Sequence, residues 1–239
     1  MTLLLTFVLG LFFLAGIYII KLAKNRELLE QLSIAVAFGA MSVLAAFDLL
    51  PELMEFCSGE EFYIPLIFVI GGIALLKILD VFIPDHGSPG DSAREMIHIG
   101  LISAFAIILH NIIEGMAVYG IALQSFRQGV TLAFGVGLHN IPMGMLIYST
   151  LRNEDRLKRH LVLAMSIGST FAGGVIMALL EEYMNTFVVG VLISITLGMI
   201  IYILVFELLS HMIRSGNRRI CISGVLAGMA VVFVSMFFE

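Results

Sequence analysis

Long apolar stretches alternate with short polar ones along the whole chain. Eight stretches contain few or no charged residues, and they cover residues 2–20, 32–54, 63–83, 96–120, 128–151, 160–180, 187–209 and 219–237. About 20 apolar residues are enough for an α-helix to cross the hydrocarbon core of a bilayer. The pattern therefore predicts an all-α polytopic membrane protein with eight transmembrane helices.

The composition supports the same interpretation. Hydrophobic residues make up 60% of the chain and charged residues 13%, compared with roughly 45–50% and 25% in soluble domains. No segment is left for a soluble domain, so we expect a single transmembrane domain over residues 1–239. The first residues lack the basic segment of a secretory signal, and we expect them to remain as part of the first helix.

The basic residues predict the orientation in the membrane. Of the thirteen Lys and Arg residues, only Arg127 falls on one side of the eight-span arrangement, and the others fall on the opposite side. Loops rich in Lys and Arg face the cytoplasm. We therefore expect a multi-pass protein of the plasma (inner) membrane with both termini outside the cytoplasm.

Two polar trios near the centres of the fourth and fifth stretches repeat each other. Each trio places His at position i, Asn at i+1 and a third residue at i+4, so the first and third side chains share one helix face. A carboxylate at such a depth costs about 2.5–3.5 kcal/mol, which indicates function. If the helices face each other, the trios meet in one cluster: His110, Glu114, His139 and Met143, flanked by Asn111 and Asn140. Imidazole and carboxylate ligands predict a midplane site for zinc, iron or manganese.

A second internal similarity lies further apart in the chain. Residues 39–52 align without gaps on residues 198–211, with Gly, Phe, an acid and Leu-Leu in register. The acids are Asp48 and Glu207. The two segments cross the predicted membrane in opposite directions, as in an inverted-topology repeat. We therefore expect spans 1–3 and 6–8 to form an inverted repeat around the central spans 4 and 5.

These residues resemble the signature of the ZIP (Zrt-, Irt-like protein) family of metal transporters, in its compact bacterial branch. The resemblance rests on His110-Asn111-x-x-Glu114-Gly115 and His139-Asn140-Ile141-Pro142-x-Gly144, and extends to the segments around Asp48, Asp80 and Glu207. It implies eight spans with both termini outside, uptake of zinc, iron or manganese into the cytoplasm, and a homodimer.

Two positions depart from the family pattern. The family usually has Glu at the position of Met143, where it bridges two metals, and often another Glu at the position of Thr170. By resemblance, the second of its two metal positions would consist of Asn111, Asn140, Met143 and Thr170. Because none of these is a carboxylate, we expect only the first position to bind metal.

The leading hypothesis is therefore a divalent-metal transporter and not an enzyme. Asp48 would receive the ion near the outer mouth, and Glu207 and His211 would guide its exit. A non-transporting or altered-substrate relative is one alternative, and an intramembrane metal-dependent hydrolase is another. The hydrolase would need a general base beside a metal-bound water, yet the chain has no His-Glu-x-x-His sequence.

The remaining histidines lie outside the predicted midplane site. His86 is the metal-capable imidazole of a turn-rich cytoplasmic loop, whereas His98 and His160 lie at cytoplasmic span ends. We expect His98 and His160 to be surface residues without a metal-binding role.

Overall fold

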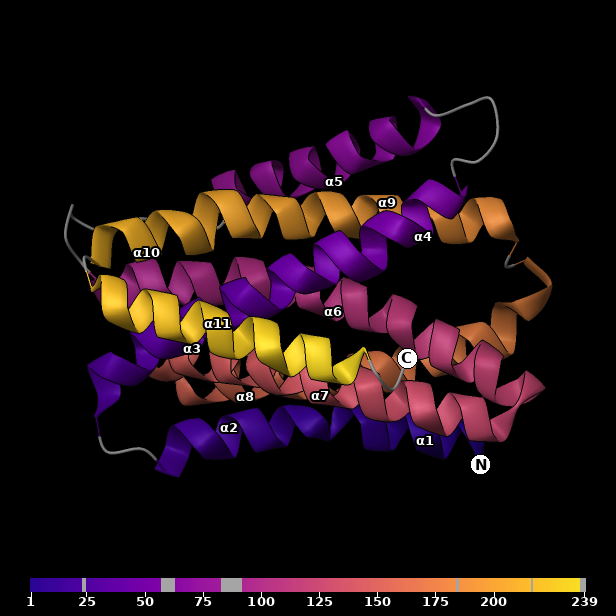
Figure 1. The fold of residues 1–239 in the computed structure, drawn as a ribbon, viewed down its shortest axis with the longest axis horizontal. Coiled ribbons are helices and arrows are strands. Elements are labelled where there is room, and N and C mark those ends of the chain that lie inside the picture. Colours follow the sequence, from indigo (N-terminus) through magenta and orange to yellow (C-terminus); the bar gives the residue numbers. More distant parts are fainter. Residues whose placement is uncertain (23–24, 57–62, 83–91, 184, 216, 237–239) are drawn as a thin grey trace.

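A computed structural model of the chain describes residues 1–22, 25–56, 63–82, 92–183, 185–215 and 217–236. Among these residues, eight helices are long and apolar enough to cross a membrane, and no β-strand occurs. Each of the eight helices coincides with one of the stretches predicted from the sequence, so the predicted all-α fold with eight spans is confirmed. The helices run side by side along the long axis of the molecule (Figure 1).

The first three spans are built as follows. The first consists of α1 (Thr2–Gly10) and α2 (Phe12–Leu22). The second consists of α3 (Arg26–Leu44), the π-helical segment η1 (Ala45–Leu49) and α4 (Leu50–Phe56), and the third is α5 (Tyr63–Phe82).

The two central spans are α6 (Ser92–Gln124) and α7 (Phe126–Thr150), and the short helix η2 (Leu151–Asn153) follows α7. The last three spans are α8 (Arg156–Leu180) with η3 (Glu181–Tyr183), then α9 (Thr186–Tyr202) with the π-helical η4 (Ile203–Leu208) and α10 (Leu209–Ser215), and finally α11 (Arg218–Ser235).

Side-chain caps define where several helices begin. The side chains of Asn25, Ser125, Asn185 and Asn217 each accept a hydrogen bond from the backbone N–H three residues later. Asn and Ser are favoured at this position because they satisfy an N–H group that has no partner within the helix. The polar residues between the apolar stretches therefore also define the helix starts.

The eight spans pack as two groups. In one group, α2 packs against α7, and α8 packs against both α1 and α6. In the other, α3 packs against α11 and α5 against α9. The fifth span, which contains α7, lies at the centre, because 67% of its most apolar 18-residue segment is buried. The corresponding share for the third span, α5, is 17%, so α5 lies at the periphery. We call these the α7 group and the α9 group below.

Glycines bring the helices of the α7 group into backbone contact. A Cβ atom on Gly115 of α6 would overlap the carbonyl oxygen of Thr170 of α8, and one on Gly173 of α8 would overlap that of Ile112 of α6. Small residues permit this close approach between membrane helices. Gly173 and Gly115 therefore allow α8 and α6 to pack backbone against backbone. Gly168, by contrast, has no neighbouring atom within 4 Å of such a Cβ.

The same reciprocal contact occurs between α2 and α7. A Cβ atom on Gly144 would overlap the carbonyl of Phe13, and one on Gly16 would overlap that of Ile141. Gly144 and Gly115 each lie five residues after the histidine of their trio. The contact of spans 1 and 5 therefore has a counterpart in the contact of spans 6 and 4.

The two segments aligned in the sequence are also similar in local structure. Asp48 lies in η1 and Glu207 in η4, so both acids occupy a π-helical segment within a long span. Spans 2 and 8 pack together, as do spans 7 and 3, which is the pairing that the predicted inverted repeat requires. The repeat itself remains a prediction.

Candidate functional site

A short connection places the two polar trios at the same depth. Only Ser125 separates α6 from α7, and its N–H donates to the carbonyl of Ile121 at 2.8 Å. The two helices are therefore adjacent and antiparallel. His110 lies fifteen residues before Ser125 and His139 fourteen residues after it, which is about 21–23 Å along each helix. His110 and His139 therefore lie at about the same depth on two antiparallel helices.

Three side chains of these trios meet at a single oxygen atom. The Nε2 atom of His110 lies 2.8 Å from Oε1 of Glu114, and the Nε2 atom of His139 lies 2.6 Å from the same Oε1. The centres of the two imidazole rings are 6.2 Å apart. The cluster predicted from the sequence is thus present in the structure for His110, Glu114 and His139.

The cluster is deeply buried. His110 is 3% exposed, His139 1% and Glu114 9%. Oε2 of Glu114 and Nδ1 of His110 are buried without a hydrogen-bond partner among the described residues. A buried carboxylate is tolerated when it is paired or binds a metal. Here two imidazoles pair with one of its oxygens, and the other oxygen retains its capacity to bind a cation.

The residues that flank the cluster are buried as well, and they are neutral. Asn111, Asn140, Met143 and Thr170 are each at most 1% exposed. Nδ2 of Asn111 donates to the carbonyl of Ser166 of α8 at 3.5 Å. The side-chain oxygens of Asn111, Asn140 and Thr170 have no hydrogen-bond partner among the described residues. These oxygens carry no charge that could offset that of a metal ion, and Met143 would add only a neutral thioether.

The donor set of the cluster fits a transition metal. Two imidazole nitrogens and one carboxylate oxygen lie within 4.8 Å of one another, and they match the ligands of zinc and of Fe(II) sites. Ligand atoms in a tetrahedral zinc site are about 3.3 Å apart, from bond lengths of 2.0–2.1 Å. The two nitrogens that now contact Glu114, at 2.8 and 2.6 Å, therefore lie about 0.5–0.7 Å closer to its oxygen than in such a site. Both nitrogens must also give up their protons to bind the ion.

A second group of potential metal ligands lies further along α6. Nε2 of His98 is 2.8 Å from Oδ1 of Asp80 on α5 and 3.9 Å from Oε1 of Glu207 in η4. These ligand atoms also lie within 4.8 Å of one another. His98 and His110 are twelve residues apart on one helix, which is about 18 Å. We call this group the Asp80 cluster.

Two further side chains hold Asp80 in place. The Tyr202 hydroxyl donates to Oδ2 of Asp80 at 2.9 Å, and Nζ of Lys77 lies 2.7 Å from the same oxygen. The other carboxylate oxygen of Asp80, Oδ1, contacts His98. Fixed carboxylates of this kind have little freedom to turn away from a ligand.

The two other predicted pathway residues lie outside both clusters. Among the residues that the structure describes, neither Asp48 nor His211 belongs to a group of metal ligands. Asp48 is half-buried in η1. Nδ1 of His211 lies 3.1 Å from Oε1 of Glu95, which also pairs with Arg214 at 2.7 Å. His211 is therefore part of an ion-pair network near the end of α10.

The prediction that His98 is a surface residue was wrong, whereas His160 lies at the surface as predicted. His160 is exposed, but the side chain of His98 is only 12% exposed and lies within the Asp80 cluster. Hydropathy places His98 at a span end but does not reveal that α5 and α9 flank it there. Asp80, an acid within the predicted third span, could have been recognised as a functional candidate. His86 lies outside the described residues.

The chain is similar to known proteins over most of its length. A family model described as ZIP Zinc transporter matches residues 85–236. The chain is 30% identical over 233 residues to Zinc transporter ZupT of Chlorobium luteolum, with 89% of this chain and 87% of that protein covered. It is also 30% identical over 226 residues to Zinc transporter ZupT of Streptococcus mutans, with 86% and 85% covered. The chain is likewise 30% identical over 202 residues to Zinc transporter ZupT of Clostridium perfringens, with 73% of this chain and 71% of that protein covered.

Proposed function

Because the chain belongs to the ZIP zinc transporter family, we propose that it carries divalent metal, zinc above all, across the membrane into the cytoplasm. Membership of this family identifies a transporter and not an enzyme, so the intramembrane hydrolase is set aside. Fe²⁺ also binds imidazole ligands and Mn²⁺ binds carboxylate ligands, so these two ions are the competing cargoes.

One observation carries the proposal for the site. His110 and His139 come from different helices and converge on the same oxygen of Glu114, at 2.8 and 2.6 Å. Hydrogen bonds between helices would need only one such contact. A convergent trio of two imidazoles and a carboxylate is instead the minimum ligand set for a mononuclear transition-metal site. Glu114 supplies the charge, and the histidines supply the selectivity over Mg²⁺ and Ca²⁺.

The Asp80 cluster supports a path from this site toward the predicted cytoplasmic face. It combines two carboxylates with an imidazole about 18 Å further along α6, at the end of the bundle that carries Arg214 and Lys77. In this proposal the ion moves from the His110–Glu114–His139 cluster to Asp80, His98 and Glu207 before release. Asp48, half-buried in η1, receives the ion on the outer side, and His211 contributes through its pairing with Glu95.

We further propose one tightly bound metal per protomer. Met143 and Thr170 are buried and occupy the positions at which the family resemblance would put carboxylates. A thioether and a hydroxyl are too weak to bridge a second divalent ion. We also expect, as before, a homodimer in the plasma membrane with both termini outside.

Reconstitution into liposomes tests the function. Proteoliposomes that enclose a zinc-sensitive dye should report zinc entry for the wild type and strongly reduced entry for Glu114→Gln, although both proteins are incorporated equally. Parallel runs with Fe²⁺ and Mn²⁺ rank the three cargoes. If the wild type and protein-free liposomes take up all three metals at the same rate, the transport proposal is refuted.

A further inference from the structure

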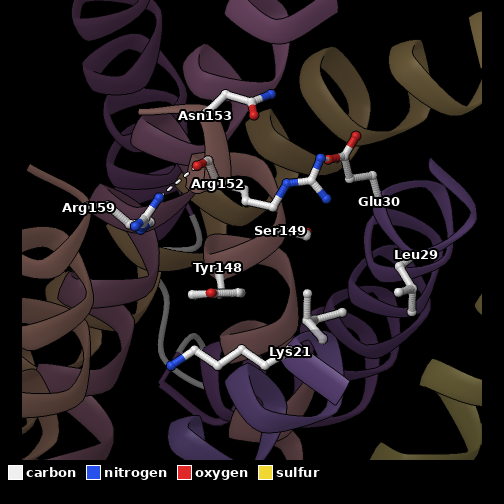
Figure 2. A pocket seen from close by; sticks show the side chains of 9 residues that line it. Lys21, Leu29, Glu30, Tyr148, Ser149, Arg152, Asn153 and Arg159 are labelled. Carbon is white, nitrogen blue, oxygen red and sulfur yellow. Dashed lines mark hydrogen bonds and ion pairs between the residues drawn. The ribbon is translucent and has the colours of Figure 1, made fainter. Parts of the chain in front are cut away.

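A polar cavity whose lining includes no residue of either metal cluster lies at the end of the bundle where α2 and α7 terminate. Its volume is about 400 Å³, within the roughly 300–1,000 Å³ of small-molecule sites. Lys21 of α2, Glu30 of α3, Arg152 of η2 and Arg159 of α8 line it, together with Tyr148 and Ser149 at the end of α7 (Figure 2). Four separate spans therefore contribute to one cavity.

The charge in this cavity is predominantly positive. Among the described residues that line it, three cations accompany one carboxylate. That carboxylate is already paired, because Nη2 of Arg152 lies 2.8 Å from Oε1 of Glu30. Nζ of Lys21 lies 5.4 Å from the ring centre of Tyr148. Arg159 donates from Nη1 to the carbonyl of Arg152 at 2.7 Å. Figure 2 shows Arg152 extended toward Glu30 and Arg159 directed at the Arg152 carbonyl.

One of these cations retains an unused donor. Nε of Arg159 is buried without a hydrogen-bond partner among the described residues. A buried guanidinium N–H without a partner carries a desolvation cost, which an anion in the cavity would remove. Because Arg159 and Lys21 have no carboxylate partner among the ion pairs of the described residues, their charges are available to such an anion.

We propose that this cavity binds a phosphate-bearing anion. Guanidinium groups recognise phosphate oxygens with directed hydrogen bonds, and lysine adds a point charge. Basic pockets between membrane helices on the cytoplasmic side are suited to anionic lipid headgroups. A free phosphate compound offers the same group. The transported metal is excluded here, because three cations repel it.

An anion bound in this cavity would affect the ion pair between Glu30 and Arg152. The ion pair of Glu30 with Arg152 joins α3, in the α9 group, to η2 in the α7 group. A phosphate in the cavity competes with Glu30 for Arg152. Removal of the Glu30 charge should therefore strengthen anion binding, whereas loss of Lys21 or Arg159 should weaken it. Because these substitutions should change the affinity for the anion in opposite directions, the proposal can be tested by comparing variants of the same protein.

The experiment uses the purified full-length protein in detergent and has two arms. In the first, inorganic phosphate is titrated while thermal unfolding is followed. In the second, native mass spectrometry counts phosphatidylglycerol retained from mixed micelles with phosphatidylcholine. The variants are Glu30→Gln, the double variant Lys21→Gln/Arg159→Gln, and Lys158→Gln as control. Lys158 lies on the same helix turn as Arg159, is 71% exposed and does not line the cavity.

Each lost cation should weaken binding about fivefold, so the double variant should lose about twenty-five-fold, and Lys158→Gln should behave as wild type. Glu30→Gln should bind about fivefold more tightly. A response in the lipid arm alone assigns a headgroup, and a response to phosphate alone assigns a soluble anion. The proposal is overturned if the wild type binds neither, or if the double variant binds like the wild type. Should the double variant fail to fold, unchanged or weaker binding by Glu30→Gln also overturns it.

Discussion

Nε2 of His139 lies 2.6 Å from Oε1 of Glu114, although the two residues are 25 positions apart and belong to different helices. The same oxygen lies 2.8 Å from Nε2 of His110. Because one oxygen receives both imidazoles, the three side chains act as a unit. The effects of substituting them should therefore not be additive.

Glu114→Gln should remove most zinc uptake with little change in folding. The amide keeps the size of the side chain but cannot compensate the charge of a desolvated divalent ion. We expect uptake by proteoliposomes to fall at least about tenfold, with a thermal midpoint close to wild type. Glu182→Gln, at an exposed position, is the control. Uptake at the wild-type rate by Glu114→Gln would remove Glu114 from the site.

His110→Ala and His139→Ala should each weaken zinc binding by at least about tenfold, as measured by calorimetric titration in detergent. The double variant should lose less than the product of the two single effects, because either deletion already breaks the shared ligand set. His160→Ala serves as the control, since His160 is exposed near the start of α8. Equal losses in all three single variants would mean that the site is elsewhere.

Met143→Glu should increase the affinity for divalent metal and create a weak second position. The new carboxylate would stand one turn after His139, near Asn111 and Asn140. It is costly without metal, so the variant should have a lower thermal midpoint that rises steeply with added zinc. Metal stoichiometry and thermal unfolding measure this. Two tightly bound metals in the wild type, or no gain in the variant, would contradict the single-metal proposal.

His98→Ala should slow zinc transport without changing zinc affinity at the midplane cluster, about 18 Å away. The Asp80 cluster would lose its only imidazole and retain Asp80 and Glu207. We expect the maximal uptake rate to fall several-fold while the titrated affinity stays within about twofold of wild type. A variant with wild-type uptake at every zinc concentration would show that the cluster serves only to tie α5, α6 and α9 together.

Gly173→Ala should destabilise the protein, and Gly168→Ala should not, although both lie on α8. A Cβ on Gly173 would overlap the backbone of Ile112, whereas one on Gly168 has open space. Overpacking of this kind costs about 1–3 kcal/mol, while alanine is favoured over glycine by up to about 1 kcal/mol in an unobstructed helix. Thermal unfolding in detergent compares the two. Equal midpoints would mean that α6 and α8 separate without cost.

The sequence was sufficient for the eight spans and for the His110–Glu114–His139 cluster. Both follow from periodicity and depth, because two trios of equal depth on consecutive antiparallel helices have one simple way to meet. The grouping of residues around Asp80 was more difficult to predict from the sequence. Their cluster depends on α5, α6 and α9 converging, and hydropathy gives the depth of a residue but not its lateral neighbours. His98 was therefore assigned to the surface. Glu207 was recognised as a pathway residue, but its partners were not.

The π-helical segments affect where the spans that contain them can lose a residue. A π-helical turn holds one residue more than an α-helical turn, so removal of one residue from η4 would let this turn close as an α-helix. The same removal from the α-helical α9 would turn everything after it by about 100°. His211 and Arg214, which both contact Glu95, lie beyond that point and would be carried away from it. Loss of a residue from the seventh span should therefore be tolerated better within η4 than within α9.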